Sequence, residues 1–212
     1  HHDIQFLPNT SNAAVWATDG GISYSTNVNA TTPTFQTKNT GYNVTQFYGG
    51  GISSVAESNN MLAGAQDNGT HKFTNSGENA TTEVTGGDGA FSHIDADDPN
   101  FQISAYVYNN YWYTTNNWST YSTISFSDYG LFINPTDFDD VNNILYGAEY
   151  PGDLTRITGF PSAPNAGYLD IPALKNGQIT ALKVDPNVNN QLWVNSKNGT
   201  GSWQEILKIE NA

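Results

Sequence analysis

The fold is decided by residues 61–70, Met61-Leu62-Ala63-Gly64-Ala65-Gln66-Asp67-Asn68-Gly69-Thr70. The first half of this stretch is small and apolar, as expected of a strand that is covered on both faces. Asp67-Asn68-Gly69 then supplies residues that tolerate a positive φ, which is the chemistry of a tight hairpin. The stretch therefore predicts a buried strand, a hairpin turn and a returning strand that starts near Thr70.

The same order of polar turn, buried strand, hairpin turn and returning strand occurs in five places along the chain. We expect Trp16, Leu62, Ala105, Tyr146 and Trp193 to occupy equivalent buried positions. The repeat length is about 40 to 48 residues, the range of four-stranded propeller blades. We therefore predict an all-β chain, a β-propeller segment of about five four-stranded blades, with a large β-sandwich as the alternative. The expected blades span residues 1–44, 45–88, 89–130, 131–177 and 178–212.

Composition agrees with one β-rich domain. A chain of 212 residues and 23.0 kDa can bury a substantial core, and nothing between the repeats resembles an interdomain linker. The net charge of -13 disfavours nucleic acid and anionic membrane as partners. No apolar run reaches the length of a membrane-spanning helix, so we expect no membrane insertion. The absence of Cys favours a bacterial over an animal source for a secreted chain of this kind.

Four segments resemble a known group of proteins: residues 19–25, 45–48, 64–70 and 86–89. In sequence and in order they are similar to the repeats of bacterial β-propellers related to sortilin and to xyloglucanases. Blades of that group often carry an Asp-box (BNR) turn, Ser-x-Asp-x-Gly-x-Thr-Trp. Degenerate versions of this turn are Ser25-Thr26-Asn27 and Thr115-Asn116-Asn117. The resemblance covers most of the chain and implies a secreted or cell-surface protein, often one module of a longer chain.

The resemblance also singles out two candidate catalytic residues, Asp19 and Asp88, because related segments carry the catalytic acids of xyloglucanases. Asp67 lies in a third turn of the same kind. A glycosidase needs two carboxylates about 5 to 10 Å apart. Asp followed by Gly is, however, also a common hairpin dipeptide. We favour the turn role, and expect that exchange of any of the three for Asn costs fold stability rather than a chemical rate.

Other chemistries fit the sequence less well. Sialidases clamp a substrate carboxylate with three arginines, and this chain has one, Arg156. The chain also lacks a Cys nucleophile and a convincing Ser-His-Asp arrangement. His1-His2-Asp3 could ligate a transition metal, or be a tag remnant or a structural turn.

Two acidic runs, 95–98 and 137–140, precede expected buried strands. Calcium would suit their hard oxygens, and Asp95, Asp97 and Asp98 are the weak candidates for such a site. Neither run has the spacing of an EF-hand loop, and Asp is common in solvated turns, which we favour here. We therefore expect no cofactor other than, at most, calcium.

Aromatic residues provide the strongest indication of binding, because they crowd the third repeat between Tyr106 and Tyr121. Alternate residues of a strand face opposite ways, so Tyr111 and Tyr113 should share one face and Trp112 the other. Such rings could form a sugar-stacking platform or a partner surface. The alternative is packing between blades. The ligand-binding candidates are Tyr111, Trp112, Tyr113 and Trp118.

Together these features favour a non-catalytic binding module for a carbohydrate or protein partner. The alternative is part of a xyloglucanase-like glycoside hydrolase that acts on polysaccharide through paired aspartates. A fan of five blades exposes sheet edges and apolar faces, which invite association. We therefore expect the propeller to be completed by further chain or by a second copy.

Overall fold

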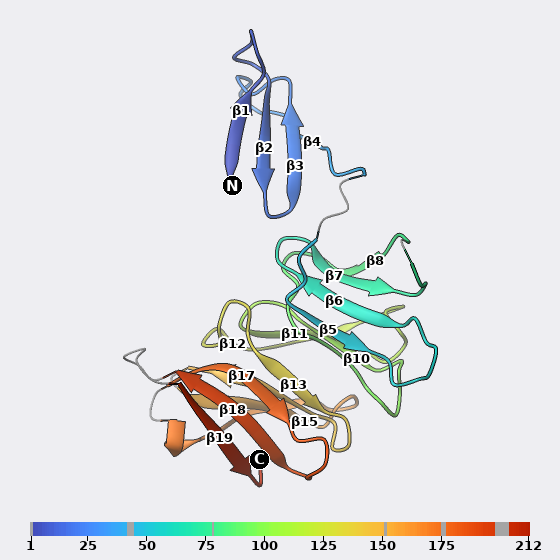
Figure 1. Cartoon of the computed structure of the whole chain (residues 1–212), viewed down its shortest axis with the longest axis vertical. Coiled ribbons are helices and arrows are strands. Elements are labelled where there is room, and N and C mark those ends of the chain that lie inside the picture. The colour runs from blue at the N-terminus through green and yellow to red at the C-terminus, as the bar shows by residue number, and fades with distance from the viewer. Residues whose placement is uncertain (1, 42–44, 78, 151, 175–176, 198–203) are drawn as a thin grey trace.

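The structure is a computed structural model that describes residues 2–41, 45–77, 79–150, 152–174, 177–197 and 204–212. Its strands form five small antiparallel sheets, which we name A to E in chain order (Figure 1). Helical structure in the described residues is confined to one 3-10 turn, Pro172–Leu174. The described part of the chain has no helix that is long and apolar enough to cross a membrane. The all-β prediction is confirmed.

Sheets A to D are meanders of four strands that pair in chain order. Sheet A consists of β1 (Asp3–Phe6), β2 (Ala14–Thr18), β3 (Gly21–Ser25) and β4 (Gln36–Thr37). Sheet B consists of β5 (Gly49–Ile52), β6 (Met61–Ala65), β7 (Gly69–Phe73) and β8 (Thr82–Thr85). Sheet C consists of β9 (Ser92–Ile94), β10 (Gln102–Ala105), β11 (Asn109–Thr114) and β12 (Ser122–Ser127). Sheet D consists of β13 (Thr136–Asp139), β14 (Ile144–Glu149), β15 (Asp153–Thr158) and β16 (Asn165–Leu169).

Sheet E has three strands among the described residues, one fewer than each of the other four sheets. Its strands are β17 (Gln178–Val184), β18 (Gln191–Lys197) and β19 (Gln204–Glu210). The first strand of sheet D also differs from the sequence prediction, which interpreted residues 137–140 as a solvated turn. β13 instead includes Asp137 and Asp139, and Asp137 is tolerated in a strand because it bonds with sheet E.

Sheets B to E stand side by side, and the first strand of each sheet lies innermost. β5 contacts β9 of the next sheet, and β13 contacts β17 in the same way. Sheet A stands apart from the other four (Figure 1). It meets sheet B through its β2–β3 turn, where the Asn68 amide donates to the backbone oxygen of Asp19 at 3.1 Å.

Apolar side chains fill the spaces between neighbouring sheets. One cluster joins sheets C and D, and a second joins sheets D and E. The largest fully buried members include Tyr111, Leu145, Ile157, Tyr146 and Leu192. Burial on this scale supplies the main driving force for stacking one blade on the next.

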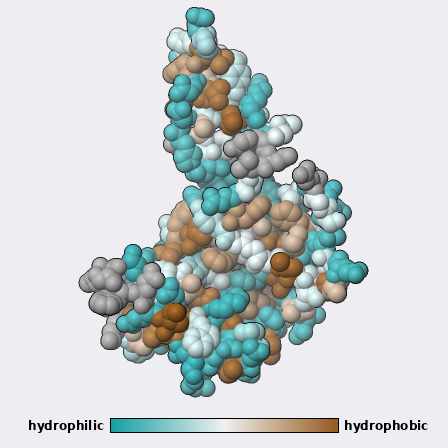
Figure 2. All heavy atoms as spheres, viewed as in Figure 1, coloured by the Kyte–Doolittle hydropathy of each residue, from teal (hydrophilic) through white to brown (hydrophobic). Residues whose placement is uncertain are grey.

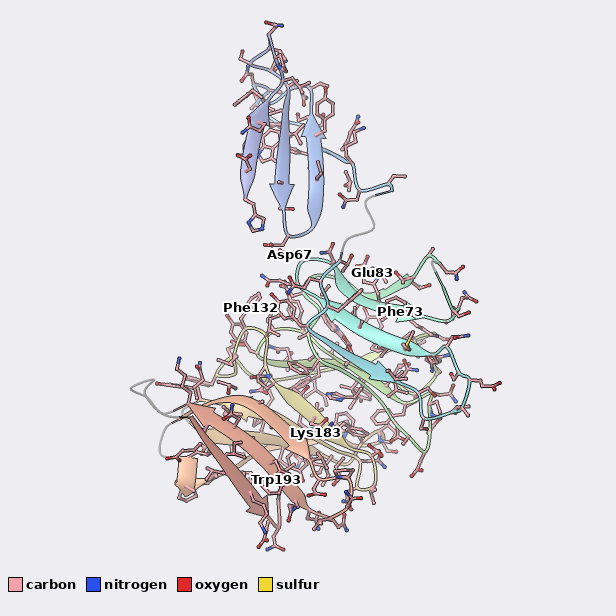
Figure 3. The ribbon with its side chains drawn as sticks, viewed as in Figure 1. Asp67, Phe73, Glu83, Phe132, Lys183 and Trp193 are labelled. Carbon is pink, nitrogen blue, oxygen red and sulfur yellow. The ribbon has the colours of Figure 1, made fainter. Side chains whose placement is uncertain are left out.

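The five residues expected at equivalent positions all lie on the second strand of their sheets. Leu62, Ala105 and Tyr146 are buried as predicted, and Trp16 is half-buried. Trp193 is 43% exposed, so that prediction is wrong for the fifth sheet. Its ring lies on the open side of sheet E, where the indole N–H donates to Asp185 at 3.0 Å (Figure 3).

Residues 61–70 interlock with residues 86–89. The Gly69 N–H donates to the Gly87 oxygen, and the Gly89 N–H donates to the Ala65 oxygen, both at 2.8 Å. Gly64 lies so close to the following segment that an added Cβ would sit 2.1 Å from the Ala90 oxygen. Glycine at this position is therefore a requirement of close backbone approach rather than of turn geometry.

Two turns with the bonding of a degenerate Asp box join the third and fourth strands of sheets A and C. Asn27 donates its N–H to the Ser25 hydroxyl and accepts one from Thr34. The Asn116 N–H in the same way donates to the Thr114 hydroxyl, and the Asn116 side-chain oxygen accepts the N–H of Thr120. The second turn is therefore Thr114-Thr115-Asn116, one residue earlier than the sequence predicts.

Candidate functional site

The three aspartates singled out by sequence come together where sheet A meets sheet B. Asp19 lies in the β2–β3 turn, Asp67 lies in the β6–β7 turn with a φ of 60°, and Asp88 follows β8. The N–H of Asp67 donates to the Asp88 carboxylate at 3.0 Å. Figure 3 shows Asp67 beneath the end of sheet A. Segments that are far apart in sequence thus place three carboxylates in one region.

The electrostatics of these aspartates differ. Partial desolvation, followed by the nearby charges of Asp88 and Asp19, raises the pKa of Asp67. The pKa of Asp19 is lowered, chiefly by its hydrogen bond with the His2 ring. Carboxyl groups whose pKa values move apart are the pattern of an acid and base pair. The backbone bond that Asp88 accepts, and the left-handed backbone of Asp67, are equally what a turn requires.

Exchange of Asp67 for Asn is expected to raise the midpoint of thermal unfolding at about pH 7 and to leave it unchanged at about pH 2.5. The pKa of Asp67 is raised in the folded protein, so its ionisation costs stability as the pH rises through the folded value. Asn tolerates the same backbone conformation. The group is exposed, and solvent screening keeps the gain small. The expected change, a gain in stability, is opposite to the loss of stability predicted from the sequence.

The control is Glu57→Gln, which neutralises an exposed acid that also has a φ of 60°. Calorimetric scans of both variants at the two pH values measure the effect. A lower midpoint for Asp67→Asn at neutral pH would show that the charge of Asp67 is favourable in the fold.

The candidate calcium residues lie in the turn between β9 and β10. One Asp95 oxygen accepts the N–H groups of Asp97 and Asp98 at 2.8 and 2.7 Å. Asp98 in turn accepts the N–H of Asn100 at 3.1 Å. These bonds use the carboxylates as turn caps. Within the described residues, no group of three or more His, Asp or Glu side chains is placed to hold a metal ion.

The same turn cap recurs in other sheets, at the end of the first strand. Asp139 accepts the N–H groups of residues 141 and 142, and Asp185 accepts those of residues 187 and 188. Asp137 lies within β13 and bonds across to sheet E. It accepts from the Lys183 ammonium at 2.8 Å and from the Val184 N–H at 2.7 Å. Residues 137–139 of this run are therefore part of the sheet, and Asp140 lies in the turn that follows.

The four aromatic candidates are divided among three environments. Tyr111 is buried between sheets C and D, and its hydroxyl donates to Asn109 at 2.6 Å. Tyr113 packs edge-on against Phe160 on the same face. Trp118 lies in the turn after β11 and donates its indole N–H to Gln102. Trp112 faces the other way, as alternation predicts.

Trp112 contributes to a cleft of about 540 Å³ on sheet C, which we name the aromatic cleft. The Trp112 and Tyr106 rings lie 4.9 Å apart, tilted by 55°. Tyr108 packs edge-on against Phe132, with ring centroids 6.0 Å apart. The aromatic cleft is lined by Tyr106, Val107, Tyr108, Asn110, Tyr111, Trp112, Thr123, Ile124, Ser125 and Asp128.

Sequence reasoning missed the polar half of the aromatic cleft. Ser125 lies in β12, and Asp128 lies in the segment after it. The aromatic residues that line the cleft with them lie earlier in the chain, in and just before β11. The sequence signal that could have indicated this polar half is the alternation of polar and apolar residues in β12, whose Thr123 and Ser125 are exposed. A cleft that combines ring faces with hydroxyl, amide and carboxylate groups suits a hydroxylated ligand.

Repeated four-stranded meanders with innermost first strands define this chain as part of a β-propeller. No family model matches the sequence, and no curated protein matches it. Among solved structures, an ancestral GH74 enzyme matches 92% of this chain with a TM-score of 0.57 and 18% sequence identity. The chain spans 27% of the length of that enzyme. At this identity the likeness shows the fold alone, a segment of a propeller like that of the glycoside hydrolase.

Proposed function

We propose that the chain is a non-catalytic carbohydrate-binding module of a larger, secreted or cell-surface β-propeller protein. The observation that carries the proposal is the Tyr106–Trp112 ring pair in the aromatic cleft. Sugar rings present C–H faces that pack on aromatic rings, and their hydroxyls need polar partners at the edge of the platform. The GH74-like fold is consistent with a carbohydrate ligand but does not supply one.

Both rings of the pair are held in place by their surroundings. Trp112 lies in β11 between two paired strands, opposite Ser104 on one side and Thr123 on the other. Tyr106 packs over Gly87, where an added Cβ would come within 3.1 Å of its ring. A platform whose rings are already held by packing loses little conformational freedom when a ligand arrives. Asn110, Ser125 and Asp128 supply hydrogen-bonding groups around it.

Exchange of Trp112 for Ala is expected to weaken polysaccharide binding at least about tenfold, because aromatic anchors dominate binding free energy. Affinity electrophoresis through gels that contain xyloglucan or mixed-linkage β-glucan measures this. The wild-type chain should be retarded by at least one of them. The matched control is Trp193→Ala, which removes an exposed Trp on sheet E and should leave the retardation unchanged. Equal retardation of the two variants, or none for the wild type, would contradict the proposal and would favour a protein partner.

The second candidate function is glycoside hydrolysis through paired aspartates, and the convergence of Asp19, Asp67 and Asp88 favours it. In this alternative Asp67, with its raised pKa, would serve as the acid. Release of reducing ends from the same polysaccharides measures it. Release that Asp88→Asn abolishes without lowering the unfolding midpoint would replace the binding proposal with the catalytic one.

A further inference from the structure

The aromatic cleft carries charge of one sign. Asp128 lines it, and among the described residues no Lys, Arg or His does so. The Asp128 side chain is exposed and takes part in none of the ion pairs of the described residues. Lys72 of sheet B bonds into sheet C, but it donates to the Asn117 oxygen, at the opposite end of β11 from Tyr108. The Asp128 carboxylate is therefore available to a positive charge that a ligand brings.

A second group of acids flanks the cleft on the side of Tyr106. Gly87 packs against the Tyr106 ring, and Asp88 directly follows it in the chain. The Asp88 carboxylate accepts the N–H of Asp67 at 3.0 Å, and the charge of Asp19 acts on Asp67 as well. The surroundings of the cleft are thus acidic on this side too. They agree in sign with the net charge of -13 of the whole chain.

The rings of the cleft favour the same sign of ligand charge. The face of an aromatic ring is negative, and it attracts an ammonium group that lies over it. The Tyr106 and Trp112 rings, 4.9 Å apart, offer such faces next to Asp128 in the lining of one cleft. A uronic acid would instead bring its carboxylate against ring faces and acids. Juxtaposed like charges lower affinity and exclude the wrong partner.

We infer that the aromatic cleft prefers a polysaccharide whose sugars carry free amino groups to neutral and acidic chains of the same length. This inference rests on the proposed carbohydrate-binding function and names the class of its ligand. The rings of Tyr106 and Trp112 pack on the C–H faces of the sugar and attract its ammonium group. Asp128 accepts a hydrogen bond from that group. A neutral glucan occupies the same cleft more weakly, because it uses the rings and hydroxyl contacts alone.

The test compares two tetramers that differ only in the group on C2 of each sugar, β-1,4-linked glucosamine and cellotetraose. Each is titrated into the isotope-labelled chain at about pH 5.5, where amines are protonated, while the indole signal of Trp112 is followed. The glucosamine tetramer should bind about fivefold more tightly or better, the combined size of an exposed ion pair and a cation–π contact. A galacturonic acid tetramer should bind more weakly than both.

Two variants and a change of pH identify the source of the preference. Asp128→Asn keeps the size of the side chain and removes its charge, so the preference should fall to about twofold or less. The matched control is Asp170→Asn, which removes the charge of an exposed Asp outside the cleft and should keep the full preference. For the wild type, a pH of about 9 discharges the sugar amines and should abolish the preference.

The outcomes separate this inference from the proposed function. Saturating shifts of Trp112 with equal affinity for the two tetramers would overturn the inference and leave carbohydrate binding in place. No shift of Trp112 with any tetramer would contradict the proposed function itself. Tetralysine, which has the charges without the sugar rings, should bind more weakly than the glucosamine tetramer. Equal binding of tetralysine would overturn the inference in favour of a basic peptide, and so would an unchanged preference in Asp128→Asn overturn the role of its carboxylate.

Discussion

Replacement of Asn109 by Ala is expected to lower the free energy of unfolding by about 3 kcal/mol or more, since each buried group left unpaired costs about 1 to 3 kcal/mol. Asn109 is fully buried at the junction of sheets C and D. Its amide donates to the Ala148 oxygen at 3.0 Å and to Glu149 at 2.6 Å. Its oxygen accepts from Tyr111 at 2.6 Å and from Asn134 at 2.9 Å. Truncation of this side chain therefore removes the hydrogen-bond partner of groups in both sheets.

Urea unfolding measures this loss, and two variants calibrate it. Tyr111→Phe removes a single hydroxyl of the same network and should cost about 1 kcal/mol. Asn75→Ala changes an exposed residue and should stay within about 0.5 kcal/mol of the wild type. A loss below about 1 kcal/mol for Asn109→Ala would mean that apolar packing alone, and not this network, joins the two sheets.

The second large effect is expected at Gly64, where Ala should cost about 3 kcal/mol. An added Cβ would lie 2.1 Å from the Ala90 oxygen and 2.5 Å from its nitrogen. Both atoms belong to backbone that packs between sheets, so neither can move without displacing β9. The matched control is Gly167→Ala in β16, where nothing lies within 4 Å and the change should be nearly neutral. Similar losses for both variants would show that the cost is a general strand effect and that the packing in sheet B is loose.

The fold could be predicted from the sequence because each repeat is marked by patterns of neighbouring residues. Small apolar runs and Asp-Gly or Asn-Gly turns mark the second and third strands of most sheets without reference to distant residues. β13 escaped prediction because Asp is rare in strands. Asp137 is tolerated there because it meets Lys183, which is 46 positions further along the chain. This pairing can be recognised only when the positions of sheets D and E relative to each other are known.

The candidate site was less predictable for a related reason. Alternation separated Tyr111 from Trp112, but it could not tell which face the neighbouring sheet covers. The segments of Asp19, Asp67 and Asp88 were recognisable, yet their meeting depends on how sheet A approaches sheet B. The hollow between the first strands of sheets B to E gave no signal, because it is formed by strand edges and by glycines that resemble ordinary turn residues in sequence.

Completion of the propeller by further chain or by a second copy remains a prediction. The chain spans 27% of the GH74 enzyme that it resembles, which is consistent with one part of a larger propeller. Ile4 and Phe6 of sheet A and Phe35 just before β4 are exposed, and Figure 2 shows hydrophobic side chains on this sheet. Exposed apolar faces of single sheets are commonly covered in an assembled protein.

The most direct test of the carbohydrate-binding proposal is to locate the ligand on the chain. A xyloglucan oligosaccharide should be titrated into the isotope-labelled protein while the indole signal of Trp112 and the side-chain amide signal of Asn110 are followed. Both signals should shift together and saturate, because both residues line the aromatic cleft. Shifts that leave these two signals unchanged and gather instead at the amides of Asp19, Asp67 and Asp88 would contradict the proposal.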